Sequence, residues 1–413
     1  MLGLALEGGG ARGAYHIGAM QACMEEGLSF DAIAGTSIGA INGAMFAQGD
    51  YAVARELWLK ITSADLFSEE ESHFLAMISR GKLSVEGLSY FREKVREALR
   101  GGGVDTSRIR AIIEKYVDVD KLLKSPVDFG LVTVSVPDFR PLELFKGQME
   151  PDRVRDYILA SASFPGMEQV SIGDKRYMDG GAYDNCPVNM LIDRGCDTVI
   201  AVRTLGLGIY RPPRDKTKTV ITIMPSEKLG PIMEFDTAVT RRSIRVGYYD
   251  ALHQLRHYAG RRYYLTGGFA SIPALARLSL VDDEAITRAA HALKISQRLP
   301  PHRLLFERLV PSLIAELDLP KTAHYGDLLG AMLENRAERA ALERLAVYTP
   351  EEFWRRVRLL RPDPQCKTSV SRGACNACDI LIDAMWHNIP ARPEQALQGL
   401  FYSPRFPVRL ILN

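Results

Sequence analysis

The segments LGLALEGGGARG (residues 2–13) and FDAIAGTSIG (residues 30–39) decide the fold class of this chain. Each is a short apolar run that ends in glycines, and each is followed by apolar residues at helical spacing. We therefore predict strands at residues 2–6 and 30–34 and helices at residues 11–26 and 37–48. Strands and helices that alternate through short links indicate an α/β fold with a parallel sheet covered on both faces.

Later segments continue this pattern and then depart from it. Further strands are predicted at residues 127–136, 141–145, 197–202 and 219–224. Residues 176–179 are typical of the second arm of a hairpin that turns at residues 173–174. Beyond residue 270 the chain is mostly helical, with helices predicted at residues 286–299, 303–317 and 325–346 and from Thr349 onward. We accordingly divide the chain into an α/β domain, residues 1–270, and a helical C-terminal region of unknown role, residues 271–413.

Residues 63–103 interrupt the α/β pattern. Aromatic and aliphatic residues are scattered among charges there, and the segment ends in three glycines. This composition predicts an inserted helical cap over an active site, and an ordinary pair of peripheral helices explains it equally well.

The charge balance gives no overall positive field that would indicate nucleic-acid binding, because 52 basic and 50 acidic side chains leave a formal net charge of +2. Basic clusters at residues 241–245 and 355–358 indicate solvated helix faces, with a patch for an anionic membrane as the alternative. The N-terminus shows no signal-peptide pattern, and no apolar run reaches the roughly 18–20 residues that a membrane span needs. We expect a cytoplasmic protein with, at most, peripheral membrane contact. The oligomeric state stays open.

Six cysteines in 413 residues do not make a disulfide scaffold. Four residues near the C-terminus, with the spacing C-x8-C-x2-C-x8-H, are candidate zinc ligands: Cys366, Cys375, Cys378 and His387. This spacing matches no standard zinc module, so zinc binding is left as an open question.

The first glycine motif formally matches the dinucleotide fingerprint G-x-G-x-x-G at Gly8, Gly10 and Gly13. A nucleotide site would need an acidic residue at the end of the second strand, but Asp31 lies at its beginning. No Lys-Ser/Thr pair follows the glycines, which disfavours a phosphate loop. What remains is a helix N-terminus whose free backbone N–H groups bind developing negative charge, as an oxyanion hole does.

The second glycine motif, GTSIG at residues 35–39, is a G-x-S-x-G turn between a strand and a helix. Such a turn presents Ser37 as a nucleophile. Ser37 follows too few strands for an ordinary α/β-hydrolase, and no motif surrounds the later histidines. Asp179, at the end of the hairpin and followed by two glycines, is the better candidate for the base.

The motifs GGGARG, GTSIG and DGG, in this order, resemble those of the patatin-like phospholipases. Residues 161–166 (SASFPG) and 185–188 (NCPV) are also similar to that family, although Phe164 is larger than the residue expected there. The resemblance covers roughly residues 1–205. It implies a three-layer sandwich with a mainly parallel central sheet, lipid ester substrates such as phospholipids, and chemistry without a cofactor or metal.

The resemblance also implies roles for individual residues. Ser37 would be the nucleophile and Asp179 its base, a serine–aspartate dyad without histidine. Backbone N–H groups would form the oxyanion hole from Gly8, Gly9, Gly10 and Ala11. Arg12 would support either a lipid head group or the glycine loop.

Three other interpretations remain open at this point. The same dyad would serve an esterase or thioesterase for soluble substrates, which would not prefer long acyl chains. A non-catalytic lipid-binding scaffold would bind vesicles without turnover. The helical C-terminal region could also be a sensor that restrains the enzyme.

Overall fold

The computed structural model describes residues 1–68, 70–71, 103–136, 138–164, 166–363, 365–366 and 368–387. The chain forms two compact units, Met1–Arg256 and His257–Asn413. The division therefore falls before residue 270, because the strand Tyr264–Leu265 pairs with Val347–Tyr348 and so ties residues just after Arg256 into the second unit. Most of the expected cap, residues 72–102, lies outside the described residues.

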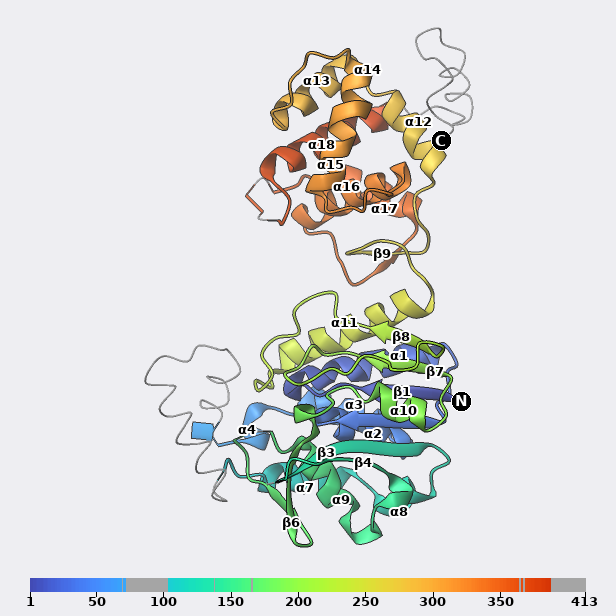
Figure 1. Ribbon diagram of the computed structural model, residues 1–413. Helices are drawn as coiled ribbons and strands as arrows, with labels where there is room; N and C mark the ends of the chain where they lie inside the picture. Colours follow the sequence, from blue (N-terminus) through green and yellow to red (C-terminus); the bar gives the residue numbers. More distant parts are fainter. Residues whose placement is uncertain are drawn as a thin grey trace. The chain divides into compact units, whose positions relative to one another are not determined.

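The first unit is mixed α/β (Figure 1). Its strands are β1 (Leu2–Leu6), β2 (Ala32–Thr36), β3 (Asp128–Val136), β4 (Pro141–Phe145), β5 (Val170–Ile172), β6 (Lys175–Asp179), β7 (Thr198–Val202) and β8 (Thr219–Ile223). Its α-helices are α1 (Ala14–Glu25), α2 (Ile38–Ala47), α3 (Tyr51–Lys60), α4 (Ser63–Leu66), α7 (Ser107–Tyr116), α8 (Val119–Lys124), α9 (Val154–Ala162), α10 (Val188–Asp193) and α11 (Thr237–Leu255). Short 3-10 turns lie at Gly10–Gly13, Lys146–Gln148, Pro151–Arg153 and Gly180–Ala182.

The described residues of this unit form one eight-stranded sheet in the order β5-β6-β3-β2-β1-β7-β8, with β4 also paired to β3. Strands β3, β2, β1, β7 and β8 run parallel, whereas β4 and β6 pair antiparallel to β3 and β5 pairs antiparallel to β6. The predicted α/β class with a mainly parallel sheet is confirmed.

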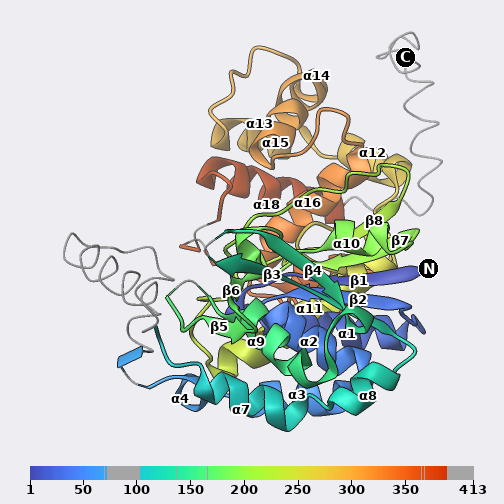
Figure 2. The ribbon, with the colours of Figure 1, turned by 60° about the horizontal axis from the view of Figure 1, so that its bottom comes forward.

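Small side chains on alternate positions of the central strands let helices approach both faces of the sheet. On one face, α10 packs against Ala5, Ala32 and Ala34. On the other face α2 and α9 lie side by side against β3 (Figure 2). The sheet is therefore the middle of three layers.

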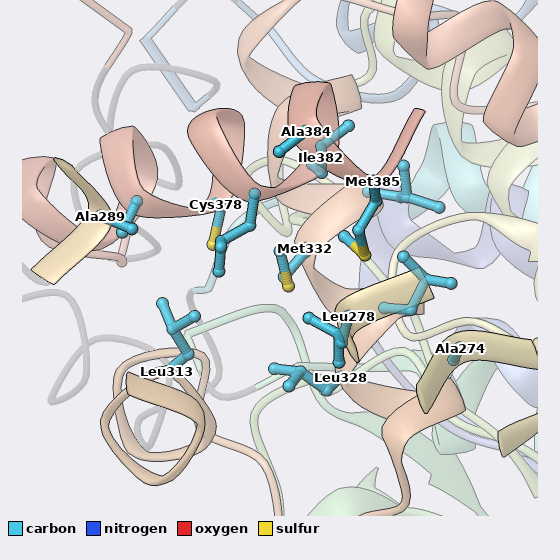
Figure 3. Packing of buried hydrophobic residues seen from close by; sticks show 14 of the residues in the cluster. Ala274, Leu278, Ala289, Leu313, Leu328, Met332, Cys378, Ile382, Ala384 and Met385 are labelled. Atoms are coloured by element: carbon cyan, nitrogen blue, oxygen red, sulfur yellow. The ribbon is translucent and has the colours of Figure 1, made fainter. Parts of the chain in front are cut away.

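The second unit is mainly helical. Its elements are β9 (Tyr264–Leu265), α12 (Ser271–Ser279), α13 (Asp283–Ala292), α14 (Pro301–Leu304), a π-helical turn (Leu305–Leu309), α15 (Val310–Glu316), α16 (Tyr325–Arg339), β10 (Val347–Tyr348), α17 (Pro350–Leu359) and α18 (Arg372–His387). Its core is aliphatic. In Figure 3, Cys378 and Met385 of α18 lie with Met332 of α16 and Leu278 of α12 in one buried cluster.

Two predicted helices of this unit end earlier than expected. The helix predicted to reach residue 299 ends at Ala292, and the one predicted to reach residue 346 ends at Arg339. Two residues after each end, the backbone adopts the left-handed conformation at a residue that is not glycine: Lys294 has φ 57° and Ala341 has φ 51°. Glycine usually occupies such positions, so the sequence carried no stop signal there.

No helix within the described ranges is both long enough and apolar enough to cross a membrane.

Candidate active site

The ends of two strands meet on one edge of β3. Thr36 of β2 pairs with Val132, and Asp179 of β6 pairs with the next residue, Thr133. Because β4 occupies the opposite edge of β3 across this region, β2 and β6 must share one edge. They approach it from opposite directions, so Ser37, which follows Thr36, arrives beside Asp179.

Ser37 lies on a sharp turn between β2 and α2, with φ 58° and ψ −129°. Left-handed backbone is rare for a residue with a side chain and marks local strain. The flanking glycines permit the turn, because a Cβ on Gly35 would lie 2.1 Å from the Gly39 carbonyl oxygen and a Cβ on Gly39 would lie 2.2 Å from that of Leu6. The motif thus has the strand–turn–helix geometry of a nucleophile elbow.

Asp179 is a buried carboxyl, 5% exposed, that accepts a hydrogen bond of 2.7 Å from the Gly181 N–H. The Ser37 side chain also favours the charged form of this carboxyl. Burial raises the pKa of Asp179 from 3.8 to about 6, and the interactions with Ser37 and Gly181 oppose the rise. The carboxylate is therefore a stronger base than an exposed aspartate, and at neutral pH most of it is still deprotonated.

The C-terminal end of α9 contacts both residues. The Ser37 N–H donates to Ser161 Oγ at 3.1 Å, and this hydroxyl donates to the Val132 carbonyl at 2.7 Å. Two residues later, the Ser163 carbonyl accepts the Asp179 N–H at 2.9 Å. One short segment therefore positions the backbone of both Ser37 and Asp179.

The glycine loop after β1 offers two free donors. The Gly8 N–H donates to the Asn185 carbonyl at 2.9 Å, and the Ala11 N–H donates to the Ile232 carbonyl at 2.6 Å. Among the described residues, no acceptor receives the N–H groups of Gly9 and Gly10. Both glycines line the same cavity as Ser37. Of the four residues that the sequence suggested for an oxyanion hole, the geometry leaves these two available.

Side chains from distant segments hold this loop in place. Arg12 donates from Nε to the Gly230 carbonyl at 2.8 Å and from a terminal nitrogen to the Leu205 carbonyl at 2.6 Å. Thr204 Oγ1 donates to the Gly8 carbonyl at 2.6 Å. These two donors of Arg12 thus go to loop carbonyls and tie the glycine loop to the segments around residues 205 and 230.

A buried ion pair anchors the start of the same region. Glu7, 2% exposed, lies 2.8 Å from a terminal nitrogen of Arg203 and accepts the N–H groups of Thr204 and Leu205 at 2.6 and 2.8 Å. A buried carboxylate with three donors is satisfied, and it fixes the end of β7 beside the end of β1.

A narrow cavity of about 90 Å³ opens beside Ser37 and Asp179. Its polar side chains, besides these two, are Asn42 and Asn185, and no histidine lines it within the described ranges. Most of the wall is apolar: Ile38, Ile41, Leu57, Trp58, Ile61, Leu66, Phe67, Ile109, Ile112, Ala162, Phe164, Met167, Leu207, Ile232, Met233 and Phe235. Such a wall suits a hydrocarbon chain.

One side of the cavity is stiffened by a buried polar chain. Trp58 Nε1 donates to Asn42 Oδ1 at 2.9 Å, and Asn42 Nδ2 donates to the Gly13 carbonyl at 3.0 Å and lies 3.2 Å from His16 Nδ1. Burial lowers the pKa of His16 to about 3, so this histidine stays neutral and cannot shift the charge of the site.

Residues 4–192 match the family model described as patatin-like phospholipase. This stretch is a patatin-like phospholipase domain. It holds the two strand ends, the glycine loop, Ser37 and Asp179, so the family resemblance and the site geometry concern the same residues.

Curated relatives agree with this assignment. Lysophospholipase NTE1 of Candida glabrata is 30% identical over 202 residues, which are 49% of this chain and 10% of that protein. The enzyme of the same name from Saccharomyces cerevisiae is 29% identical over a stretch of equal length and coverage. An uncharacterized NTE family protein of Mycobacterium bovis is 24% identical over 290 residues, 70% of this chain and 42% of that protein. The alignments with the two yeast enzymes thus cover about a tenth of their length.

Among solved structures, that of VipD from Legionella pneumophila aligns with 98% of this chain and 93% of its own, at 14% identity and a TM-score of 0.40.

Some residues around the patatin-like site were not singled out from the sequence. Ser161 belongs to the SASFPG segment that is similar to the family. Nothing in the sequence indicated that its side chain contacts Ser37. Thr204 and Ile232 lie beyond the family match and carry no motif. Only the tertiary structure brings them to the glycine loop.

The cysteine cluster near the C-terminus belongs to the second unit. Cys378 is buried in the aliphatic core (Figure 3), and burial raises the pKa of its thiol well above the usual range. Zinc binding requires a thiolate, which this environment disfavours. Within the described ranges, no three His, Cys, Asp or Glu side chains gather in a way that could hold a metal ion.

Proposed function

We propose that this protein hydrolyses carboxylic esters of lipids, as a phospholipase or lysophospholipase does, with Ser37 as nucleophile and Asp179 as base. The observation that carries the proposal is the pairing of a strained serine with a buried carboxyl of raised pKa at the mouth of an apolar cavity. The patatin-like family match and the lysophospholipase relatives support the substrate class.

In the proposed first step, Asp179 accepts the Ser37 proton while Oγ forms a bond to the ester carbonyl carbon. The carbonyl oxygen becomes an oxyanion, which the N–H groups of Gly9 and Gly10 stabilise. Each such donor is worth ~2.7–4 kcal/mol of transition-state stabilisation. The intermediate then breaks its bond to the alcohol oxygen, which takes the proton back from Asp179 and leaves an acyl-enzyme.

In the second step, water attacks the acyl-enzyme carbonyl and gives its proton to Asp179. Collapse of this second oxyanion breaks the bond to Ser37 Oγ, which recovers the proton from Asp179. The net reaction consumes an ester and water and yields a carboxylic acid and an alcohol. No histidine takes part, because one carboxylate handles the proton in both directions.

Labelling with a fluorophosphonate, followed by intact mass, tests the assignment of Ser37. We expect one adduct on the wild-type protein and none on Ser37→Ala, and hydrolysis of lysophospholipids and phospholipids should be lost in the same variant. Ser29→Ala, an exposed serine in the loop before β2, is the matched control and should label normally. Turnover retained by a folded Ser37→Ala protein would overturn the proposal.

A further inference from the structure

A second cavity lies wholly within the helical unit, and neither the family match nor the proposed hydrolysis accounts for it. It measures about 630 Å³, which is in the range of small-molecule sites. Its wall comes from residues 268–277, from the first turns of α17 and from Leu329 and Trp386. All of these residues follow residue 256, so the cavity is complete within one unit.

Three aromatic side chains form a continuous row along this cavity. The ring centroids of Phe269 and Trp354 are 6.1 Å apart and those of Trp354 and Trp386 are 6.4 Å apart. Pro273, Pro350 and Leu329 add further apolar surface to the wall. The rings are inclined to one another, by 64° and 37° respectively, and together they offer an apolar aromatic surface for a hydrocarbon chain.

Arg277 of α12 lies in the same wall and has no carboxylate partner among the described residues. Its guanidinium is centred 5.2 Å from the Trp354 ring, and its one hydrogen bond within the described ranges, to the Pro273 carbonyl, is long at 3.5 Å. Burial lowers the pKa of Arg277, and no acidic residue offsets that change. Most of its five N–H donors are therefore left for a ligand.

The acidic residues of the same wall do not neutralise Arg277. Glu352 is paired with Arg356 of its own helix at 2.7 Å, and Glu351 is exposed at the rim. A second donor is also unsatisfied, since the indole N–H of Trp354 is buried and has no acceptor in the part of the chain that the structure describes. A partly desolvated cation without a counter-ion is costly, and an entering anion would remove that cost.

We propose that this cavity binds an amphiphile whose anionic oxygen group pairs with Arg277 and whose hydrocarbon part lies along Phe269, Trp354 and Trp386. The planar guanidinium fork matches a carboxylate or a phosphate. A free fatty acid and a phosphate-bearing lipid share this chemistry. The proposal does not depend on hydrolysis at Ser37.

Tryptophan fluorescence can isolate this cavity, because the chain has 3 tryptophans and the third, Trp58, lines the cavity of the first unit. In a Trp58→Phe protein, all indole emission comes from Trp354 and Trp386. We would titrate it with 12-bromododecanoate below its micelle concentration, since bromine quenches indole on contact. Saturable quenching is expected, with competition by unlabelled dodecanoate and none by the neutral dodecanol.

Substitution of Arg277 tests whether its charge binds the anionic group of the amphiphile. In the Trp58→Phe background, Arg277→Gln should weaken binding about tenfold or more, the usual consequence of losing a hydrogen-bonded charge. Arg288→Gln, an exposed arginine of α13 outside the cavity, is the matched control and should leave binding unchanged. Competition by dodecyl phosphate stronger than that by dodecanoate would identify a phosphate lipid as the source, and the reverse order a fatty acid.

Two results would overturn the proposal. One is the absence of saturable quenching in a folded protein, and the other is equal affinity in the Arg277→Gln and Arg288→Gln proteins. If Trp58→Phe fails to fold, calorimetric titration of the wild-type chain with dodecanoate replaces the fluorescence. Arg277→Gln should then remove one class of site that Arg288→Gln retains, and identical isotherms for the two variants would count against the site.

Discussion

At the scale of single residues, Asp179 carries the chemistry that we propose. Its carboxyl is buried beside the Ser37 side chain, and burial outweighs the interactions with Ser37 and Gly181 that favour the charged form. A pKa of about 6 places the base close to the pH at which it would work, which is where general-base catalysis is most effective.

The pH dependence of activity follows from this pKa. Protonated Asp179 cannot accept the serine proton, so kcat/KM for a soluble p-nitrophenyl ester should rise about tenfold per pH unit up to about pH 6 and then level off. Asp179→Asn should lower kcat/KM at pH 8 by ~10²-fold or more. Asp174→Asn, at the exposed turn of the same hairpin, should keep the wild-type profile. A profile that is flat from pH 4 to 8 would contradict the role of Asp179.

The buried carboxyl of Asp184 should make the stability of the folded protein depend on pH. Burial raises its pKa from 3.8 to about 7, and its Oδ2 has no partner among the described residues. The folded state therefore holds the proton more tightly than the unfolded chain, and the unfolding free energy should fall as the pH rises from about 4 to 7. Because a tenfold difference in proton affinity corresponds to about 1.4 kcal/mol, the loss of unfolding free energy is on the order of 4 kcal/mol.

Asp184→Asn should remove most of this loss, because the amide stays neutral and can still accept the Cys186 N–H that Asp184 accepts at 3.2 Å. Urea unfolding at pH 5 and pH 8 would measure it. The variant should be less sensitive to pH than the wild type and than the Asp174→Asn control. Equal slopes in all three proteins would show that Asp184 is ionised at its ordinary pKa.

At the scale of elements, the end of α9 sets the separation of nucleophile and base. Ser161 bonds the Ser37 N–H through its side chain, whereas Ser163 bonds the Asp179 N–H through its backbone. The side chain of Ser163 donates only to the Leu159 carbonyl of its own helix. The two serines therefore differ in what a substitution would remove.

Ser161→Ala should lower kcat by about tenfold and the unfolding free energy by ~1–3 kcal/mol, because the Ser37 N–H and the Val132 carbonyl lose this partner. Ser163→Ala keeps the backbone contact with Asp179 and should change both quantities much less. Steady-state kinetics and urea unfolding of the two variants make the comparison. Equal losses in both would indicate that the hydroxyl of Ser161 does not position Ser37.

The first turn of α2 is the second element on which the site depends. Gly39→Ala would place a methyl group 2.2 Å from the Leu6 carbonyl oxygen, which is backbone of β1 and cannot move aside. We expect a loss of ~3 kcal/mol or more in unfolding free energy, with loss of fluorophosphonate labelling. Gly43→Ala, one turn later in α2, meets only side-chain atoms, the nearest of them on Ile33 at 3.3 Å, and should stay within about 1 kcal/mol of wild type. A Gly39→Ala protein as stable as Gly43→Ala would refute the packing argument.

At the scale of the whole molecule, each unit holds a core of its own. The first is built on the sheet, and the second on helices α12, α13, α16 and α18, as in Figure 3. The residues of the proposed active site all lie in the first unit, and those of the proposed amphiphile site all lie in the second.

Core truncation should therefore act on one unit at a time. Met332→Ala removes a fully buried side chain and should cost ~2–5 kcal/mol in the second unit, with labelling of Ser37 unchanged at a temperature where the variant is folded. Leu4→Ala, in β1 of the first unit, should reduce both stability and labelling. Thermal unfolding combined with fluorophosphonate labelling distinguishes the two. Loss of labelling in a folded Met332→Ala protein would show that the units are coupled.

Much of this protein could be predicted from its sequence because the relevant signals are local. Apolar runs that end in glycine, such as those before Gly8 and Gly35, mark buried strands followed by sharp turns. The α/β class follows from their alternation with helical patterns. Ser37 is predicted as the nucleophile because it lies at the centre of the G-x-S-x-G turn. The sequence did not predict the helix ends at Ala292 and Arg339. Lys294 and Ala341 adopt the left-handed backbone conformation that usually marks a helix end with glycine, and neither residue is glycine.

The tertiary structure alone decided which groups meet and which stay free. Ser37 reaches Asp179 because β2 and β6 share an edge of β3, and that pairing depends on hydrogen-bond register between distant segments. Carbonyls from residues 185 and 232 engage the N–H groups of Gly8 and Ala11, and so leave those of Gly9 and Gly10. The raised pKa of Asp179 likewise depends on the atoms that exclude water from it. Register and desolvation are non-local properties, so they exist only once the chain has folded.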